Sequence, residues 1–317
     1  MTSALVLAGG GITGIAWESG VLAGLAAGGI DPLRWNLVVG TSAGAYVGAR
    51  LTVDGSPDPL FAVQTSGNDA AEEDGLRILF GRGFVRAVRL SRRRSLRWIG
   101  TAWVAAFVAT TLVRHAARHG WRSTLATART LAPGQTTGEP GRIAATMGAI
   151  ADLKRKDANR LIEHWEHALG AGRAWPPTRL VATALDTSDG SRILFDCATG
   201  VSLVAAVAAS TCLPGLLAPV PWRARRYMDG GIVSPANADV AAGHDEVWIL
   251  CPSDSGSLDR EVADLREARS VVHLIQPSDA ARMVMPHGLG ELDPANRLAA
   301  ATAGFADGLA AAAAVNG

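Results

Sequence analysis

The sequence predicts an α/β protein that carries an inserted helical cap. Short apolar runs of strand length alternate with longer helical patterns, and two of these runs end in glycine-rich turns that lead directly into helices. The chain has 317 residues, of which 48% are hydrophobic, so it can bury a large core. A helical insertion at about 76–135 and a C-terminal helix at about 294–315 fit on one sheet, and we expect residues 1–317 to form a single domain.

The first strand is the apolar run 4–8, and a glycine loop follows it. This loop contains Gly9, Gly10, Gly11 and Gly14 and leads into a helical stretch expected from residue 14 to residue 27. Glycines let backbone N–H groups come close to a ligand, and a helix N-terminus adds partial positive charge, so the loop suits an anion. A dinucleotide loop has the same spacing, but no acidic residue follows at a strand end about 20 residues later, which disfavours that alternative.

The second strand, 36–39, leads into a candidate nucleophile. Gly40, Ser42 and Gly44 form a Gly-x-Ser-x-Gly pattern, and a helix is expected from residue 45. A sharp turn between a strand and a helix lifts a serine hydroxyl above the sheet, as a nucleophile elbow requires. The same pattern alone could be a turn of small residues without chemistry. Its position between strand and helix favours catalysis.

Asp229 is the candidate base. It follows the strand-like run 225–228 and precedes Gly230 and Gly231, which would let other groups approach closely. The ordinary alternative is an Asp-Gly hairpin turn. A triad of Ser42, Asp229 and His244 can also be written, but only the strand that bears the glycine loop lies ahead of the strand and elbow of the serine, whereas several do in α/β-hydrolases. His244 and His287 stay open as candidates, although neither lies in a motif.

These residues resemble the patatin-like phospholipases, in particular the bacterial members. Four blocks occur in the family order: the glycine loop 9–14, the elbow 40–44, the stretch 209–215 and the Asp-Gly-Gly at 229–231. Residues 180–187 and 191–195 look like the family's paired central strands. The resemblance implies a three-layer α/β/α fold with a mostly parallel sheet. It also implies a Ser-Asp dyad of Ser42 and Asp229, without histidine, and an oxyanion hole at Gly9, Gly10 and Gly11.

The activity that this resemblance implies is lipid acyl hydrolysis, of phospholipase A or lysophospholipase type, through an acyl-enzyme. Two departures are visible, because Ala8 and Thr13 occupy places where the family usually has an acidic and a basic residue. A soluble carboxylesterase or thioesterase with the same dyad, and a non-catalytic lipid-binding protein, remain as alternatives. No cofactor or metal is expected, because the three cysteines are isolated and no cluster has ligand spacing.

A basic segment runs from 75 to 138. It has no aspartate or glutamate, and all its cationic residues apart from histidines are arginines: Arg77, Arg82, Arg86, Arg89, Arg92, Arg93, Arg94, Arg97, Arg114, Arg118, Arg122 and Arg129. Arginine binds phosphate groups through a planar fork, and such a run is attracted to anionic membranes. We therefore expect lipid contact through Arg92, Arg93, Arg94, Trp98 and Trp103. Nucleic acid is the disfavoured partner, because no binding motif is present.

Residues 98–113 within this segment are uncharged and would form an apolar helix about 24 Å long, slightly short of a bilayer core. We favour a cap over the active site, with an interfacial anchor and a true span as alternatives. The start of the chain lacks signal-peptide features, so a cytoplasmic enzyme is expected, peripherally bound to membrane if 98–113 is an anchor. The oligomeric state is not predicted.

Overall fold

A computed structural model describes residues 1–67, 69–91, 158–214, 216–253 and 256–317. Within them lies one eight-stranded sheet in the order β5-β6-β3-β2-β1-β7-β8, with β4 paired to β3. The strands are β1 Ser3–Leu7, β2 Leu37–Thr41, β3 Arg179–Asp186, β4 Arg192–Phe195, β5 Val220–Trp222, β6 Arg225–Asp229, β7 Glu246–Leu250 and β8 Val271–Ile275.

The sheet is mixed and mostly parallel. Strands β3, β2, β1, β7 and β8 run parallel to one another, whereas β4, β6 and β5 are antiparallel to their neighbours. Strand β1 lies in the middle, is buried throughout and pairs with β2 and β7. The predicted strands at 4–8, 36–39, 180–187, 191–195, 247–250 and 271–275 are confirmed, with ends that differ by a few residues.

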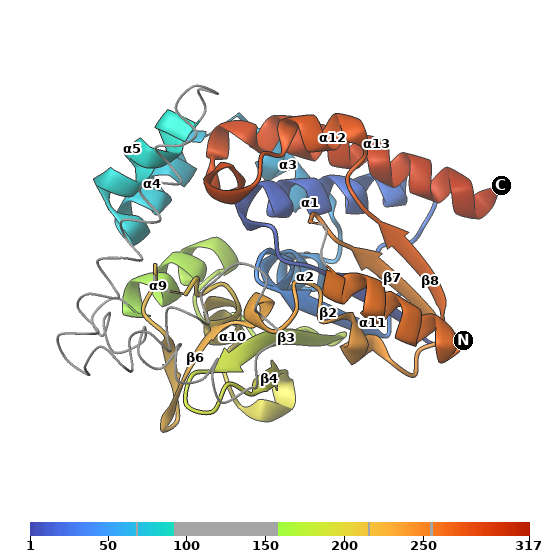
Figure 1. The fold of residues 1–317 in the computed structure, drawn as a ribbon, viewed down its shortest axis with the longest axis horizontal. Helices are drawn as coiled ribbons and strands as arrows, with labels where there is room; N and C mark the ends of the chain where they lie inside the picture. The colour runs from blue at the N-terminus through green and yellow to red at the C-terminus, as the bar shows by residue number, and fades with distance from the viewer. Residues whose placement is uncertain (68, 92–157, 215, 254–255) are drawn as a thin grey trace.

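Helices cover both faces of the sheet, as Figure 1 shows. The α-helices are α1 Gly11–Ala27, α2 Ala43–Asp54, α3 Asp58–Thr65, α4 Asp69–Phe80, α5 Arg82–Ser91, α9 Ala158–Leu169, α10 Leu203–Ser210, α11 Gly256–Glu267, α12 Asp279–Val284 and α13 Arg297–Asn316. The short 3-10 helices are η2 Cys197–Thr199, η3 Gly230–Ile232, η4 Ala238–Ala241, η5 Gly288–Leu292 and η6 Pro294–Asn296.

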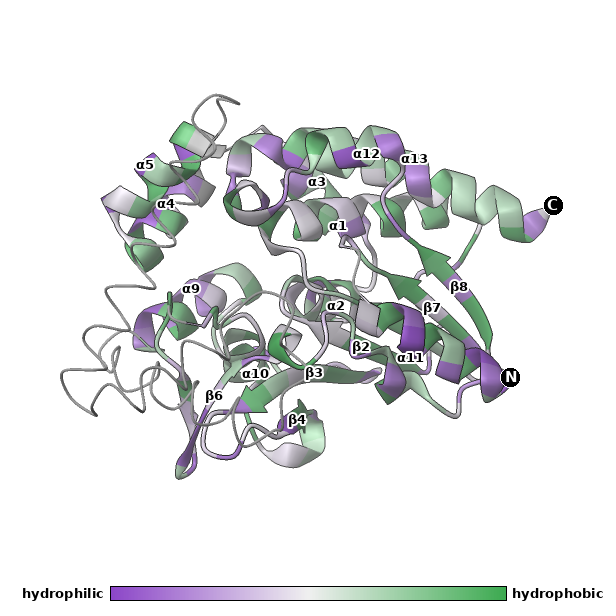
Figure 2. Ribbon diagram, viewed as in Figure 1, coloured by the Kyte–Doolittle hydropathy of each residue, from purple (hydrophilic) through white to green (hydrophobic). Residues whose placement is uncertain are grey.

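Alternate side chains of the strands enter two separate hydrophobic cores. Leu5, Leu7 and Val38 pack with α1, α2, α10 and α13 on one face, and Val6 and Val39 pack with α11 and η4 on the other. This alternation follows from the period of two along a strand. Figure 2 shows the central strands as mainly hydrophobic and α11 with hydrophilic residues along its length. The predicted three-layer α/β/α architecture is therefore confirmed.

Helices α1 and α13 approach each other unusually closely. A Cβ added at Gly20 would lie 2.1 Å from the Ala301 carbonyl oxygen, and one added at Gly308 would lie 2.2 Å from that of Val21. The Trp17 indole N–H also donates to Asp307 across this contact, at 2.8 Å. Residues 294–316 are long and apolar enough to cross a membrane by length and composition. The contact with α1 shows that α13 has a packing role in the fold.

Some predicted boundaries were wrong. The first helix begins at Gly11, not at residue 14, so two of the loop glycines belong to its first turn. The C-terminal helix begins with the turn η6 before α13. The predicted insertion starts within α4 and includes α5, whereas the predicted apolar helix 98–113 lies outside the described residues.

Candidate active site

Ser42 lies in a sharp turn between β2 and α2. Its backbone has φ 53° and ψ −116°, a strained combination for a residue with a side chain. The turn is possible because α2 begins against β1: a Cβ at Gly44 would lie only 2.1 Å from the Leu7 carbonyl oxygen. The Gly44 N–H instead donates to the Ala8 carbonyl at 3.0 Å. The local structure is the strand, turn and helix that the sequence predicted.

Asp229 ends β6, next to the end of β2. Strand β6 pairs antiparallel with β3, which places Asp229 opposite Ala184, and β3 in turn pairs with β2 through Thr183 and Thr41. The Asp229 carboxylate accepts a hydrogen bond of 2.7 Å from the Gly231 N–H, and the Ser42 hydroxyl lies near enough to lower the pKa of the carboxyl group. The sheet topology therefore joins two residues that are far apart in the sequence.

Burial changes the proton affinity of this carboxyl group. Asp229 is only 4% exposed, and the loss of solvation raises its pKa to about 6, although the hydrogen bonds from Ser42 and Gly231 act in the opposite direction. A carboxylate with this pKa is a stronger base than an ordinary aspartate and is still mainly ionised at neutral pH.

The glycine loop lies beside Ser42, with a Cβ at Gly9 placed 3.4 Å from the Ser42 Cβ. The Gly9 N–H, however, donates to the Pro235 carbonyl at 2.9 Å, so it is already used inside the protein. Gly9 was predicted to belong to the oxyanion hole, and its N–H would have to give up or share this bond to stabilise an oxyanion. Gly10 and Gly11 remain as candidate donors at the N-terminus of α1, where Gly11 has φ 61°.

Thr13 lies where the family usually has a basic residue. Its side chain is 1% exposed, and its hydroxyl faces back toward the Gly10 carbonyl at 3.5 Å. The place of the usual cation is therefore filled by a neutral, buried group that contacts the loop. The positive end of α1 remains, since its first turn contains no acidic residue.

The stretch 209–215, to which the sequence analysis assigned no role, supports both Ser42 and Asp229. The Ser210 hydroxyl oxygen, at the end of α10, accepts a hydrogen bond from the Ser42 N–H at 2.9 Å. Two residues later, the Cys212 carbonyl accepts one from the Asp229 N–H at 3.1 Å. Sequence reasoning assigned no role to Ser210 or Cys212, because their partners Ser42 and Asp229 lie in other segments of the chain.

Neither open histidine candidate joins this pair. The His244 ring hydrogen-bonds to the Ala241 carbonyl at 2.9 Å and lies before β7, at the end of the sheet opposite to Ser42. A strand of five residues spans about 17 Å, which separates the two ends. His287 is exposed and lies 3.9 Å from Glu291.

Two of the predicted supporting glycines lie in tight contacts of the site. A Cβ at Gly40 would lie 2.5 Å from the Ala45 Cα, and one at Gly230 would lie 2.4 Å from the Thr183 hydroxyl oxygen. Gly14 has ordinary spacing, because a Cβ there would meet its nearest neighbour at 3.5 Å.

The predicted lipid contacts Arg92, Arg93, Arg94, Trp98 and Trp103 lie outside the described residues. Among the residues that the structure describes, no group of three or more His, Cys, Asp or Glu side chains could hold a metal ion.

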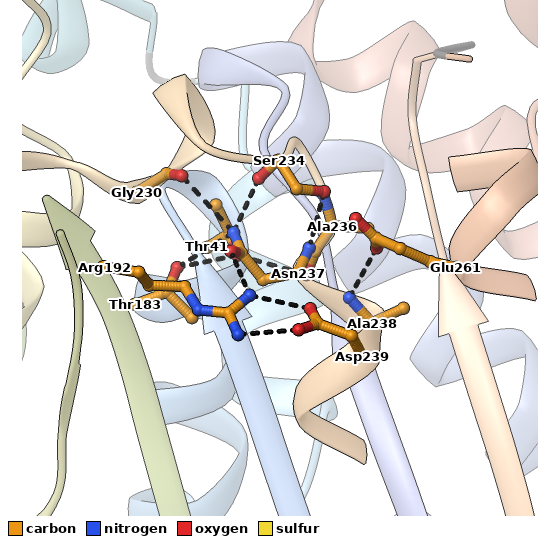
Figure 3. A network of polar contacts seen from close by, with 10 residues as sticks. All are labelled: Thr41, Thr183, Arg192, Gly230, Ser234, Ala236, Asn237, Ala238, Asp239 and Glu261. Carbon is orange, nitrogen blue, oxygen red and sulfur yellow. Dashed lines mark hydrogen bonds and ion pairs between the residues drawn. The ribbon is translucent and has the colours of Figure 1, made fainter. Parts of the chain in front are cut away.

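A polar network around the buried Asn237 connects the segments next to Ser42 and Asp229, and Figure 3 shows this network. It joins Thr41, which precedes Ser42, to the segment that follows Asp229, through the side chain of Asn237. No sequence pattern indicated this role, because Asn237 lies in a loop without a recognised motif.

The fold and site are those of a three-layer α/β protein in which a serine after β2 and an aspartate at the end of β6 are brought together. A family model described as patatin-like phospholipase matches residues 5–242, and the chain belongs to this family. Membership implies a lipid acyl hydrolase. A search of curated proteins found no match. Among solved structures, the chain is similar to VipD from Legionella pneumophila, with 13% identity and a TM-score of 0.42 over 99% of this chain and 67% of VipD.

Proposed function

We propose that this protein hydrolyses fatty-acyl esters of phospholipids or lysophospholipids, with Ser42 as nucleophile and Asp229 as general base. The observation that carries the proposal is the closeness of the Ser42 hydroxyl to the buried Asp229 carboxylate, which is near enough for the hydroxyl to lower the pKa of that carboxyl group. A nucleophile within hydrogen-bonding reach of a base is the arrangement that serine acyl transfer requires.

In the first half-reaction, the Ser42 oxygen attacks the ester carbonyl carbon and Asp229 takes the hydroxyl proton. The negative charge that develops on the carbonyl oxygen is stabilised by the N–H groups of Gly10 and Gly11 and by the N-terminus of α1. The bond to the alcohol then breaks, and the alcohol or lysolipid leaves with the proton from Asp229. The fatty acyl group remains on Ser42.

In the second half-reaction, Asp229 takes a proton from a water molecule, whose oxygen attacks the acyl carbonyl carbon. The bond to the Ser42 oxygen breaks, Asp229 returns the proton to this oxygen, and the fatty acid is released. Each proton that Asp229 accepts is returned in the same half-reaction, so the pair needs no third residue.

The test uses a soluble nitrophenyl ester and phospholipid vesicles. Ser42→Ala and Asp229→Asn should each abolish turnover, and a fluorophosphonate should label wild-type protein at Ser42. Because the base acts when ionised, activity should rise with pH through about 6. Asp196→Asn is a matched control, since Asp196 caps η2 through its side chain and an amide keeps that cap. Full activity of Asp229→Asn together with loss of activity in His244→Ala would contradict the dyad.

A further inference from the structure

The segment from Gly230 to Asn237 touches each part of the proposed site. It follows Asp229 directly, its Pro235 carbonyl accepts the Gly9 N–H at 2.9 Å, and its Ala236 carbonyl accepts the Thr41 hydroxyl at 3.2 Å. One short segment is therefore bonded to the base, the glycine loop and the residue before the nucleophile.

Asn237 holds this segment in place. Its side-chain N–H groups make their shortest contacts with the Ser234 carbonyl, at 2.6 Å, and the Thr41 hydroxyl, at 3.1 Å. The Gly230 carbonyl and the Thr183 hydroxyl lie further away, each at 3.4 Å. The amide thus ties the loop after the base to the strand before the nucleophile (Figure 3).

The backbone around Asn237 fits this role. Asn237 is fully buried, and its backbone lies in the left-handed region, at φ 53° and ψ 40°. Asparagine tolerates this region better than most residues do. Its own N–H donates to the Ser234 hydroxyl oxygen at 3.0 Å, which closes a tight loop within the segment.

Arg192 fixes the orientation of the Asn237 side-chain amide through the amide oxygen. The Arg192 guanidinium donates to the amide oxygen of Asn237 at 3.1 Å and forms a two-bond fork with Asp239, at 2.7 and 2.6 Å. A flipped amide would direct its NH2 group at the guanidinium and its oxygen at the Ser234 carbonyl, so both contacts would be repulsive. Arg192 therefore selects the orientation in which Asn237 donates to Thr41.

We propose that Asn237 is a positioning residue that sets the distance between the Ser42 hydroxyl and the Asp229 carboxylate, with Arg192 and Asp239 fixing its amide. This inference rests on the proposed function of Ser42 and Asp229. Loss of the amide would let the Asp229 loop move away from the elbow. A small displacement of reacting groups lowers the rate strongly, by up to about 10²-fold.

The test compares Asn237→Gly with Asn36→Ala. Glycine keeps the left-handed backbone and removes the amide. Asn36 precedes β2 at its other end, where its side-chain oxygen accepts a hydrogen bond from the Ser3 N–H at 2.8 Å, so its loss removes a sheet contact away from the site. We expect fluorophosphonate labelling of Ser42 to slow by at least about tenfold in Asn237→Gly and to stay at the wild-type rate in Asn36→Ala.

The pH profile of labelling separates positioning from folding. If the Asp229 loop opens to water, the midpoint of labelling should move from about 6 toward the ordinary aspartate value of about 4. The groups that face Asp229 among the described residues are the Ser42 hydroxyl, the Gly231 N–H and the Cys212 thiol, which is neutral because burial raises its pKa above the usual range. A general loss of stability would lower the amount of active protein without moving this midpoint.

Arg192→Met provides a second variant if Asn237→Gly does not fold, because the Arg192 side chain is partly exposed. Its kcat for the soluble ester should fall several-fold while KM changes little. Wild-type labelling rate and midpoint in a folded Asn237→Gly, or wild-type kcat in Arg192→Met, would overturn the inference and leave the proposed function intact. A folded wild-type protein that is not labelled at Ser42 would overturn both.

Discussion

At the level of single residues, the site depends on the Asp229 carboxylate, whose negative charge is buried where ionisation is unfavourable. The folded protein raises the pKa of Asp229 from 3.8 to about 6, so between these values the folded state binds the proton and the unfolded state releases it. The contribution of this group to stability is therefore lost as pH rises through that window. Above pH 6 the ionised carboxylate is kept in the core at a cost in stability.

Asp229→Asn should consequently stabilise the protein while it abolishes activity. We expect the free energy of unfolding in urea at pH 7.5 to increase by about 1–3 kcal/mol, because the substitution removes the cost of ionising a buried carboxyl group. The gain should be much smaller at pH 4, where the folded wild-type carboxyl is protonated. A variant that is less stable than the wild type at pH 7.5 would show that the carboxylate's hydrogen bonds outweigh its desolvation.

Ser210 gives a second prediction for one residue. Ser210→Ala removes the acceptor of the Ser42 N–H and leaves a polar group without its partner next to a strained turn. We expect labelling of Ser42 to slow by about tenfold, with a loss of about 1–3 kcal/mol in stability. Ser202→Ala is the matched control: Ser202 caps the opposite end of α10, and its loss costs about 1 kcal/mol. Equal labelling rates in the two variants would exclude a role for Ser210 in holding the elbow.

The sequence singled out Ser42 and Asp229, which the fold brings together, but it did not indicate the residues that support them. Ser42 and Asp229 lie in short motifs whose glycines are required by close backbone contacts, and such contacts leave a recognisable spacing. Ser210, Pro235 and Asn237 act through hydrogen bonds to residues distant in the chain, which no local pattern records. The same reason explains why the contact of the Gly9 N–H was not foreseen: its acceptor, Pro235, lies 226 positions away in a loop without a predicted structure.

At the scale of elements, the strands were predictable because each central strand is an uninterrupted apolar run buried on both faces. Helices rich in glycine were harder. The first turn of α1 contains Gly11 and Gly14, and glycine disfavours helix, so a start at residue 14 was the natural expectation. The packing of α1 between the sheet and α13 overrides that local preference.

The contact between α1 and α13 predicts which glycines cannot change. Gly308→Ala would place a Cβ 2.2 Å from the Val21 carbonyl oxygen, so the two helices must separate. We expect a loss of about 1–3 kcal/mol, measured as a lower urea midpoint and faster proteolysis of α13. Gly83→Ala in α5 is the control, since a Cβ there meets nothing within 4 Å and alanine favours helix. Unchanged stability of Gly308→Ala would mean that α13 shifts without cost.

At the level of the whole molecule, the order of motifs along the chain indicated that the glycine loop and the Ser42 elbow lie together. Parallel strands end at the same edge of a sheet, which places the glycine loop after β1 beside the elbow after β2. Asp229 reaches the same place through antiparallel pairing of β6 with β3. That reversal was not visible in the sequence, because the pattern of a short strand does not reveal its direction.

The distribution of charge leads to a prediction for the whole protein. The formal net charge is +1, yet the segment 75–138 contains twelve arginines and no acidic residue. We propose that this segment brings the enzyme to anionic lipid. In flotation experiments the protein should bind vesicles that contain phosphatidylglycerol more strongly than neutral phosphatidylcholine vesicles, and added salt should weaken the binding.

Replacing Arg92, Arg93 and Arg94 with glutamine tests the source of this attraction. At about 1 kcal/mol per arginine, the triple variant should bind anionic vesicles about 10²-fold more weakly and hydrolyse a soluble ester at the wild-type rate. The control removes the same charge from exposed positions in and after α11, at Arg260, Arg266 and Arg269. If net charge alone attracted the protein to the vesicles, both triple variants would bind more weakly by the same factor. Equal binding by the two variants would therefore contradict a role for the basic segment.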